Sequence, residues 1–352
     1  MLNVRKIWEN SNIARDWPDL AASARFDEPM ANHTTFRVGG PADLFVRPAS
    51  EESLAALVNF LFAQDVPVSL IGGGSNLLVA DRGIRGAVIS LEALSSIYTE
   101  KGEDAGSDAG RNVEMANPGA PRNTSVESPA IVTAGSGASM KALTEWCATR
   151  GLSGLERFAG LPGSVGGAAF MNARCYDRSV SDVFFGGRVL YFDRSGYTLL
   201  KVPFRESEWD YKRSPFQERV SADSVGLSPG DWVISAVSFA LRPGERGAIE
   251  REMAGYIADR EAKGHFRFPS AGSMFKNNRA FGKPSGVIID ETGLKGFRIG
   301  DAQVAPWHGN IVINAGNASA ADLRRLVEEV RRRVLERTGF SLESEVILAG
   351  DW

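Results

Sequence analysis

The sequence contains little of what disulfide, metal and membrane proteins require. Its 352 residues include only two cysteines, Cys147 and Cys175, and three histidines. These counts exclude a disulfide scaffold and a zinc site built from two CxxC pairs, and we expect no metal. No stretch reaches the ~18 consecutive apolar residues of a transmembrane helix, so we expect no membrane insertion. Residues 1–20 carry charges every few positions and lack the apolar core of a signal peptide, which favours a cytoplasmic protein with reduced thiols.

The sequence also lacks an excess of charge of either sign. Forty Lys and Arg residues against 43 Asp and Glu residues give a formal net charge of −3, so no global field favours nucleic acid. Hydrophobic residues at 43% and charged residues at 24% are typical of globular domains. At ~100–200 residues per domain, the length predicts two or three domains.

The usual nucleotide-binding fingerprints are missing as well, although the chain has 38 glycines. No glycine cluster has the G-x-G-x-x-G spacing, and no GxxxxGK[ST] motif occurs. The glycines instead gather in short loops after apolar runs, at 36–43, 71–78, 135–139 and 160–172. Because glycine has no Cβ, such loops let backbone N–H groups approach a phosphate closely. Each cluster alone is more often a tight turn, but together they indicate a non-Rossmann site for a dinucleotide with a flat ring.

Helical and strand patterns alternate along the chain, which predicts an α+β protein. Strands are expected at 42–48 and 83–91, with several more in 185–241, and helices at 51–64 after an N-cap at Ser50, at 139–150 before Gly151, at 246–263 and at 318–339. The basic run Arg331 to Arg333 lies in the last of these helices, where a solvated face is the favoured interpretation over a binding patch. Residues 100–129 have no hydrophobic periodicity and are interpreted as a flexible surface insertion, with an ordered lid as the alternative.

A set of motifs in fixed order carries a family resemblance. They are NHTTFRVGGPADLFVRP, IGGGSNLLVAD, GLERFAGLPGSVGGAAFMNA, YKRSPFQ, FPSAGSMFKN, SGVIIDETGLKGFRIGDAQV and LESEVILAG. Over about residues 30–350 the chain resembles the UDP-N-acetylenolpyruvoylglucosamine reductase family.

The resemblance implies an FAD-binding fold of the vanillyl-alcohol-oxidase (PCMH) type in two subdomains, with a C-terminal α/β substrate-binding domain. We place these at 1–90, 91–242 and 243–352. The implied reaction passes hydride from NADPH through FAD to the enolpyruvyl group of UDP-N-acetylglucosamine enolpyruvate, giving UDP-N-acetylmuramate for peptidoglycan precursors. The expected partner is this small molecule alone, and the expected state is a monomer.

The same resemblance assigns roles to individual residues. Ser273 matches the proton donor, and Glu345 matches the carboxylic acid that assists it. Substrate-binding positions fall on Tyr211, Lys263, Asn277 and His308. For His308, a packed or strand-capping histidine is the alternative. Cofactor-binding positions fall on Arg37, Gly72, Gly73, Gly74, Ser75, Asn76, Gly135, Gly163, Ser164, Gly167 and Ala168.

Two departures from the family pattern stand out. The family reads Tyr-Arg-x-Ser where this chain has Tyr211-Lys212-Arg213-Ser214, so the catalytic arginine falls on Lys212, with Arg213 one residue later. Only arginine offers a planar fork to a carboxylate, and neighbours on a strand point to opposite faces. Both residues remain candidates, with Lys212 preferred.

In the second departure, at 171–182, larger residues replace small ones, which leaves the local loop shape open. Cys175 in this stretch has no evident base beside it, so we expect no nucleophilic role.

Two other functions compete with the reductase. An FAD oxidase or dehydrogenase of the same fold would share the glycine loops but would not need GSMFKN, GLKG and LESEV. A nucleotide-sugar-binding protein that has lost the flavin has the Lys212 departure as its support.

Overall fold

The computed structural model describes residues 3–100, 128–193, 196–219 and 225–352. The α-helices are α1 (Val4–Glu9), α2 (Ile13–Asp16), α3 (Pro18–Ser23), α4 (Glu51–Ala63), α5 (Met140–Thr149), α6 (Val165–Phe170), α7 (Arg246–Ala262), α8 (Ser285–Glu291) and α9 (Ala320–Thr338). The strands are β1 (Arg25–Pro29), β2 (Pro41–Val46), β3 (Val68–Ile71), β4 (Leu77–Val79), β5 (Ile84–Ser90), β6 (Ile97–Thr99), β7 (Ala130–Gly135), β8 (Leu152–Ser153), β9 (Arg174–Cys175), β10 (Arg178–Ser179), β11 (Phe184–Asp193), β12 (Gly196–Pro203), β13 (Gly226–Leu227), β14 (Trp232–Pro243), β15 (Ser270–Ser273), β16 (Arg298–Ile299), β17 (Ala302–Val304), β18 (Ile311–Asn314) and β19 (Ile347–Ala349).

The first sheet leads directly into the glycine loop at 72–76. Its strand order is β1-β2-β5-β3-β13, with β2, β5 and β3 parallel to one another. The crossover helix α4 begins at the predicted N-cap, where Ser50 and Ser53 form a reciprocal capping box. The apolar face of α4 packs on the sheet, burying Leu54, Leu57 and Leu61. The packing of α4 on the sheet therefore fixes the position at which the chain leaves β3 and enters the glycine loop.

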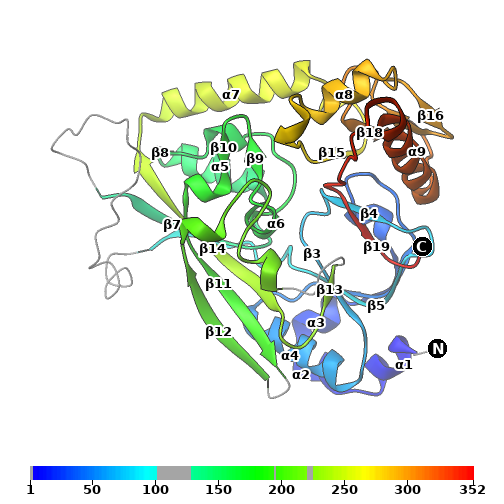
Figure 1. Cartoon of the computed structure of the whole chain (residues 1–352). Helices are drawn as coiled ribbons and strands as arrows, with labels where there is room; N and C mark the ends of the chain where they lie inside the picture. Colours follow the sequence, from blue (N-terminus) through cyan, green and yellow to red (C-terminus); the bar gives the residue numbers. More distant parts are fainter. Residues whose placement is uncertain (1–2, 101–127, 194–195, 220–224) are drawn as a thin grey trace.

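The second sheet is antiparallel, with the order β12-β11-β14-β7-β6 (Figure 1). Helices α5 and α6 share its core, where Leu143 and Val165 lie with Phe239 of β14. Ser139 caps α5, and Gly151 follows it with φ +65, as the sequence predicts. This layer positions the second glycine segment, 160–167, at the start of α6.

The third sheet has the order β15-β18-β17-β16, and α8 and α9 pack against it. Helix α9 starts after a capping box at Ser319 and ends at left-handed Gly339. Leu323, Leu326 and Val334 of α9 are fully buried. The arginine run lies on its outer side: Arg332 and Arg333 both pair with Glu329, and Arg332 also pairs with Glu336. The solvated-face interpretation is thus confirmed.

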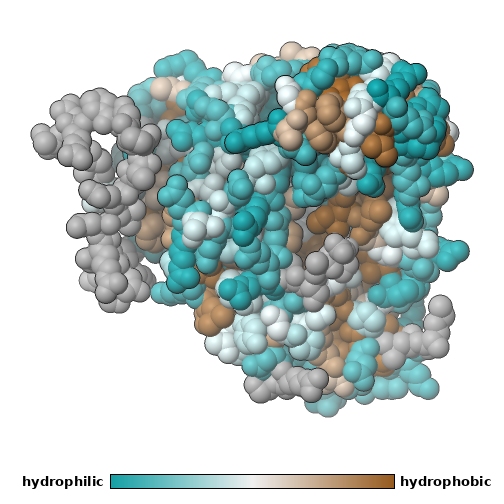
Figure 2. All heavy atoms as spheres, viewed as in Figure 1, coloured by the Kyte–Doolittle hydropathy of each residue, from teal (hydrophilic) through white to brown (hydrophobic). Residues whose placement is uncertain are grey.

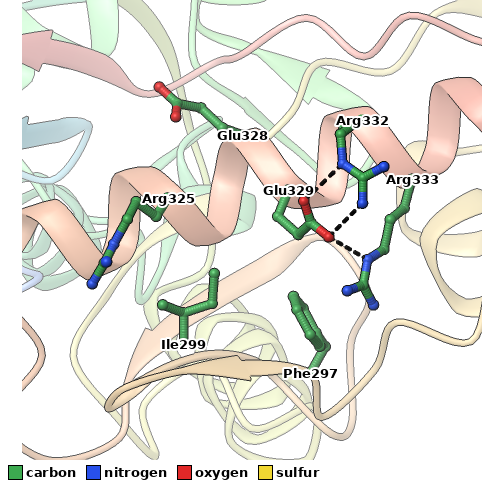
Figure 3. A pocket seen from close by; sticks show the side chains of 7 residues that line it. All are labelled: Phe297, Ile299, Arg325, Glu328, Glu329, Arg332 and Arg333. Carbon is green, nitrogen blue, oxygen red and sulfur yellow. Dashed lines mark hydrogen bonds and ion pairs between the residues drawn. The ribbon is translucent and has the colours of Figure 1, made fainter.

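A depression between α9 and β16 lies beside this ion-pair cluster (Figure 3). It is lined by Phe297, Ile299, Arg325, Glu328, Glu329, Arg332 and Arg333. Glu329 bonds both Arg332 and Arg333 within 2.7 Å, so these three charges are already paired with one another.

Two short strands tie distant parts of the chain together. Strand β13 pairs with β3, and the C-terminal strand β19 runs parallel to β4 beside the glycine loop at 72–76 (Figure 1). Helix α7, in turn, packs Ile249 and Met253 against Ala148 and Ala159 of the second layer. The division at 1–90, 91–242 and 243–352 stays a prediction, because the packing crosses each of these boundaries.

The predicted insertion at 100–129 lies, except for its end residues, outside the described part of the chain. Strands β6 and β7 on either side of it pair antiparallel, with Thr99 opposite Val132.

Within the described residues, no helix is long and apolar enough to cross a membrane, and no group of three His, Cys, Asp or Glu side chains could hold a metal ion.

Candidate active site

Two of the predicted glycine loops lie against each other. A Cβ on Gly73 would come within 2.7 Å of the Gly163 Cα atom, and one on Gly72 within 2.3 Å of Ser164 Oγ. Gly163 has φ +101, and the Ser75 hydroxyl donates to the Pro162 carbonyl across the contact. Backbone approach this close requires glycine, so the structure brings together loops that are about 90 positions apart.

The remaining cofactor candidates surround these loops. Ser164 caps α6 by accepting a hydrogen bond from Gly167 N, and Ala168 is buried in the following turn. Gly135 ends β7, where a Cβ would meet the Leu94 carbonyl. Arg37 is exposed and has φ 56 in the segment that precedes β2.

Asn76 has a contact that the sequence did not predict. Its amide Nδ2 donates to the Glu345 carbonyl at 3.0 Å, and its own carbonyl accepts from Ile347 N. The predicted cofactor loop therefore holds the backbone of the predicted catalytic glutamate.

Lys212 and Glu345 form an ion pair at the centre of this arrangement. The Lys212 Nζ atom lies 2.5 Å from Glu345 Oε1, and the two side chains are only 13% and 11% exposed. Charges that are so nearly buried are usually paired, because an unpaired one loses its hydration without compensation. The pair joins the loop before β13 to the segment just before β19.

Of the two alternatives at this position, the geometry favours Lys212. Arg213 pairs with Glu218, and its side chain is 53% exposed. From the sequence we treated residues 211–214 as part of a strand, and this prediction was wrong. Asp210 and Arg213 bond to each other's backbone, and Lys212 has φ 57, so these residues form a turn. The side chains diverge because of the turn and not because of strand alternation.

Ser273 lies at the end of β15, where it is exposed. The next residue, Met274, accepts a backbone hydrogen bond from Glu345 N at 2.8 Å. The structure thus places Ser273 one residue from the backbone contact that holds Glu345.

The predicted substrate residues Tyr211, Asn277 and His308 meet at the start of α8. Asn277 N donates to the Tyr211 hydroxyl at 3.3 Å, while its side-chain Oδ1 accepts from Ser285 N. A Cβ on neighbouring Gly286 would lie 3.3 Å from the His308 ring. Burial lowers the pKa of His308, which favours a neutral ring, and its Nδ1 accepts from Asn310 N.

Lys263 stands at the end of α7, near a second polar group. It pairs with Asp259 at 2.6 Å, and Asp259 also accepts from the Tyr176 hydroxyl at 2.7 Å. The sequence gave no sign that Tyr176 would make this bond. Burial and the Asp259 contact raise the pKa of Tyr176 to about 12, so the phenol stays protonated.

Neither cysteine has the surroundings of a nucleophile. Cys147 is buried, and burial raises its pKa to about 12. Burial also raises the pKa of Cys175, whose Sγ accepts from Arg260 at 3.1 Å. A thiol held in its neutral form is a poor nucleophile, which agrees with the expectation for Cys175.

The chain was compared with known proteins. The model of the UDP-N-acetylenolpyruvoylglucosamine reductase C-terminal domain matches residues 264–349, and an FAD binding domain model matches 42–118. The UDP-N-acetylenolpyruvoylglucosamine reductase of Treponema denticola is 43% identical over 352 residues, covering all of both chains. This chain belongs to the UDP-N-acetylenolpyruvoylglucosamine reductase family.

More distant members agree. The reductase of Borreliella burgdorferi is 33% identical over 91% of this chain and 93% of its own. The crystal structure of the Thermus caldophilus reductase has 29% identity and a TM-score of 0.63, covering 93% of this chain and 98% of that one. The predicted FAD-binding α+β fold is confirmed, and the chain is an FAD-dependent oxidoreductase.

The residues at the glycine loops fit FAD. Among the described residues, the hydroxyls of Thr35 and Ser136 are buried without a hydrogen-bond partner. Thr35 N bonds to Gly74 O, and Ser136 O accepts from Gly166 N, so both hydroxyls belong to the two loops. A buried hydroxyl left unpaired costs about 1–3 kcal/mol, and the oxygen atoms of a pyrophosphate would accept both. Neither residue stood out in the sequence.

The surface near these loops is partly apolar. Figure 2 shows apolar side chains in a hollow where, in Figure 1, α6 lies across from β4 and β19, and more hydrophilic side chains surround it. The flavin-free alternative rested on Lys212, and the buried pair with Glu345 gives that residue a place in the site.

Replacing Gly73 by valine should give protein without flavin. The new Cβ would meet the Gly163 backbone at 2.7 Å and push the two loops apart. Flavin content after purification, from visible absorbance per protein, measures this. Gly255→Val is the matched control, because a Cβ there meets nothing within 4 Å. A fully flavinated Gly73→Val protein would contradict the loop assignment.

Acid should destabilise the protein partly through His265. Burial, with the Arg260 charge, lowers the pKa of His265 from 6.5 to about 4. Between these values the unfolded chain binds a proton that the folded chain does not, so stability falls as pH drops through this window. His265→Gln should therefore lose less melting temperature than wild type between about pH 7.5 and about pH 5. An equal loss in both proteins would show that His265 does not contribute.

Proposed function

We propose that Ser273, Lys212 and Glu345 carry the reaction of this family, the reduction of the enolpyruvyl group of UDP-N-acetylglucosamine enolpyruvate in peptidoglycan precursor synthesis. The observation that carries the proposal is the nearly buried ion pair between Lys212 and Glu345. Glu345 also donates from its backbone N to the Met274 carbonyl, one residue from Ser273, although Lys212, Ser273 and Glu345 are far apart in the sequence.

The substrate sets what these residues must do. Bound FAD would supply the hydride, originating from NADPH, that the terminal vinyl carbon receives. Negative charge then develops at the neighbouring carbon and spreads into the adjoining carboxylate. A positioned cation stabilises such charge more in the transition state than in the ground state.

Lys212 supplies that cation. Its ammonium group is held by Glu345 Oε1 rather than by solvent, so its direction is fixed before substrate arrives. A preoriented charge in a poorly solvated site costs little reorganisation during the reaction. Glu345 is fixed in turn by Asn76 and Met274 through its backbone.

Ser273 supplies the proton that completes the second carbon. A serine hydroxyl is a weak acid, so it needs a site that stabilises the alkoxide left behind, and in this proposal the Lys212 charge meets this need. The exposed position of Ser273 at the end of β15 leaves the hydroxyl open to a substrate.

The substrate's nucleotide is bound, in this proposal, by Tyr211, Asn277, His308 and Lys263. The first three are linked at the start of α8. A lysine and an amide suit a diphosphate and a uracil. A cytoplasmic monomer acting on this small molecule, without nucleic acid, completes the proposal.

Ser273→Ala should separate the two half-reactions. NADPH should bleach the flavin of the variant at the wild-type rate, because that step needs no acid from Ser273. Reoxidation by the enolpyruvyl substrate should slow by roughly 10²–10⁴-fold, the usual effect of a general acid. Stopped-flow visible absorbance follows both steps. Ser270→Ala, in the same strand, is the control. Slower bleaching with normal reoxidation would refute the assigned role.

Lys212→Met and Arg213→Met should behave very differently. The first leaves the Glu345 carboxylate nearly buried without its partner, so melting temperature should fall and substrate-driven reoxidation should slow strongly. The second removes an exposed pair with Glu218, and such pairs contribute about 0–1 kcal/mol. If Arg213→Met were the slower enzyme, the site would have to be rebuilt around Arg213.

A further inference from the structure

The backbone at Lys212 is held in a conformation that lysine rarely adopts. Its φ of 57 lies in the left-handed region. For residues other than glycine, this region is unfavourable, because Cβ approaches the following carbonyl oxygen. Such a conformation persists only where the surroundings fix it. The neighbours of this turn therefore identify what aims the lysine.

Gln217 contacts the turn with both ends of its amide. Its Nε2 donates to the Lys212 carbonyl at 3.2 Å, and its Oε1 accepts from Ser214 N at 3.3 Å. Its own backbone N donates to the Ser214 carbonyl at 3.2 Å. A single side chain thus spans the residue whose φ is positive and the residue that ends the turn.

The start and end of the turn are anchored to the segment around α6. Asn172 Nδ2 donates to the Asp210 carbonyl at 2.8 Å, and Ser214 Oγ donates to the Phe170 carbonyl at 2.6 Å. Ser214 is fully buried, and Asn172 is 2% exposed. Because both ends of the turn are fixed in this way, the peptide that follows Lys212 is the remaining part of the turn. The Gln217 side chain holds that peptide through its bond to the Lys212 carbonyl.

We infer that Gln217 is a positioning residue that holds Lys212 in the left-handed turn from which its ammonium group reaches Glu345. The inference rests on the role proposed for Lys212. Lysine has a long flexible stem, so the position of Nζ depends on the direction in which the backbone launches the side chain. A rotation out of the left-handed region would point the stem away from Glu345. Misplacement by about 1 Å can slow a reaction roughly 10²-fold.

Gln217→Met tests the inference, because it keeps the length of the side chain and removes its hydrogen bonds. Flavin content and bleaching by NADPH should match wild type, while reoxidation by substrate should slow roughly 10-fold or more. Gln217 is partly exposed, so the variant should fold, and Gln217→Ala provides a second version. Gln303→Ala is the matched control, since Gln303 also donates to a backbone carbonyl, that of Gly296, at 3.1 Å.

A double-mutant cycle separates positioning from general structural support. If Gln217 acts through Lys212, the Met substitution should slow reoxidation in the wild-type background and add little in the Lys212→Met background. The affinity of the oxidised protein for the enolpyruvyl substrate, measured by calorimetry, should show the same non-additivity. Equal losses in both backgrounds, or no loss in either, would overturn the inference.

The cycle also separates this inference from the proposed function. If Lys212→Met reoxidises at the wild-type rate, the role of Lys212 fails, and the role of Gln217 fails with it. If Lys212→Met is slow and Gln217→Met is normal, only the inference about Gln217 is overturned.

Discussion

The Lys212–Glu345 ion pair joins two distant segments of the chain in a nearly buried contact. Lys212 comes from a turn between β12 and β14 of the second sheet, and Glu345 comes from the segment just before β19, 133 positions further along the chain. Removing two charges from water is costly, and their attraction offsets this cost only when the geometry is well kept. A contact of 2.5 Å between side chains so little exposed is therefore weak evidence for stability. It is better evidence that the surrounding backbone is arranged to keep the two groups together.

The C-terminal segment shows how that arrangement is built. Strand β19 pairs with β4, immediately after the glycine loop at 72–76, and Asn76 in that loop bonds to the Glu345 backbone. Asp81 accepts from the first two backbone N–H groups of α9, which ties the same region to the third layer. Because the glycine loop at 72–76 and the segment that holds Glu345 share these contacts, a displacement of one would displace the other. Asn76 thus has a structural task that a role in cofactor binding alone would not explain.

Local signals in the sequence predicted the regular elements well. Ser50 caps a helix where expected, because an N-cap depends on a few neighbouring residues. The helices expected at 139–150 and 318–339 also form, after caps at Ser139 and Ser319. The glycine loops were identified for the same reason. The pairings of β13 with β3 and β19 with β4 join segments far apart, and short strands give no periodic signal. The turn at Lys212 was taken for a strand because its positive φ is carried by lysine, which does not mark such turns.

The exchange of arginine for lysine at this position can be understood from the pair itself. Arginine binds a carboxylate through a rigid planar fork, which both positions and charges the contact. Lysine has a compact ammonium group with three donors, so its direction must come from elsewhere. Here Glu345 accepts from one of those donors and fixes the group. The planar geometry of a guanidinium would by itself orient the contact. In this family member, a carboxylate on one side and a left-handed turn on the other orient the lysine instead.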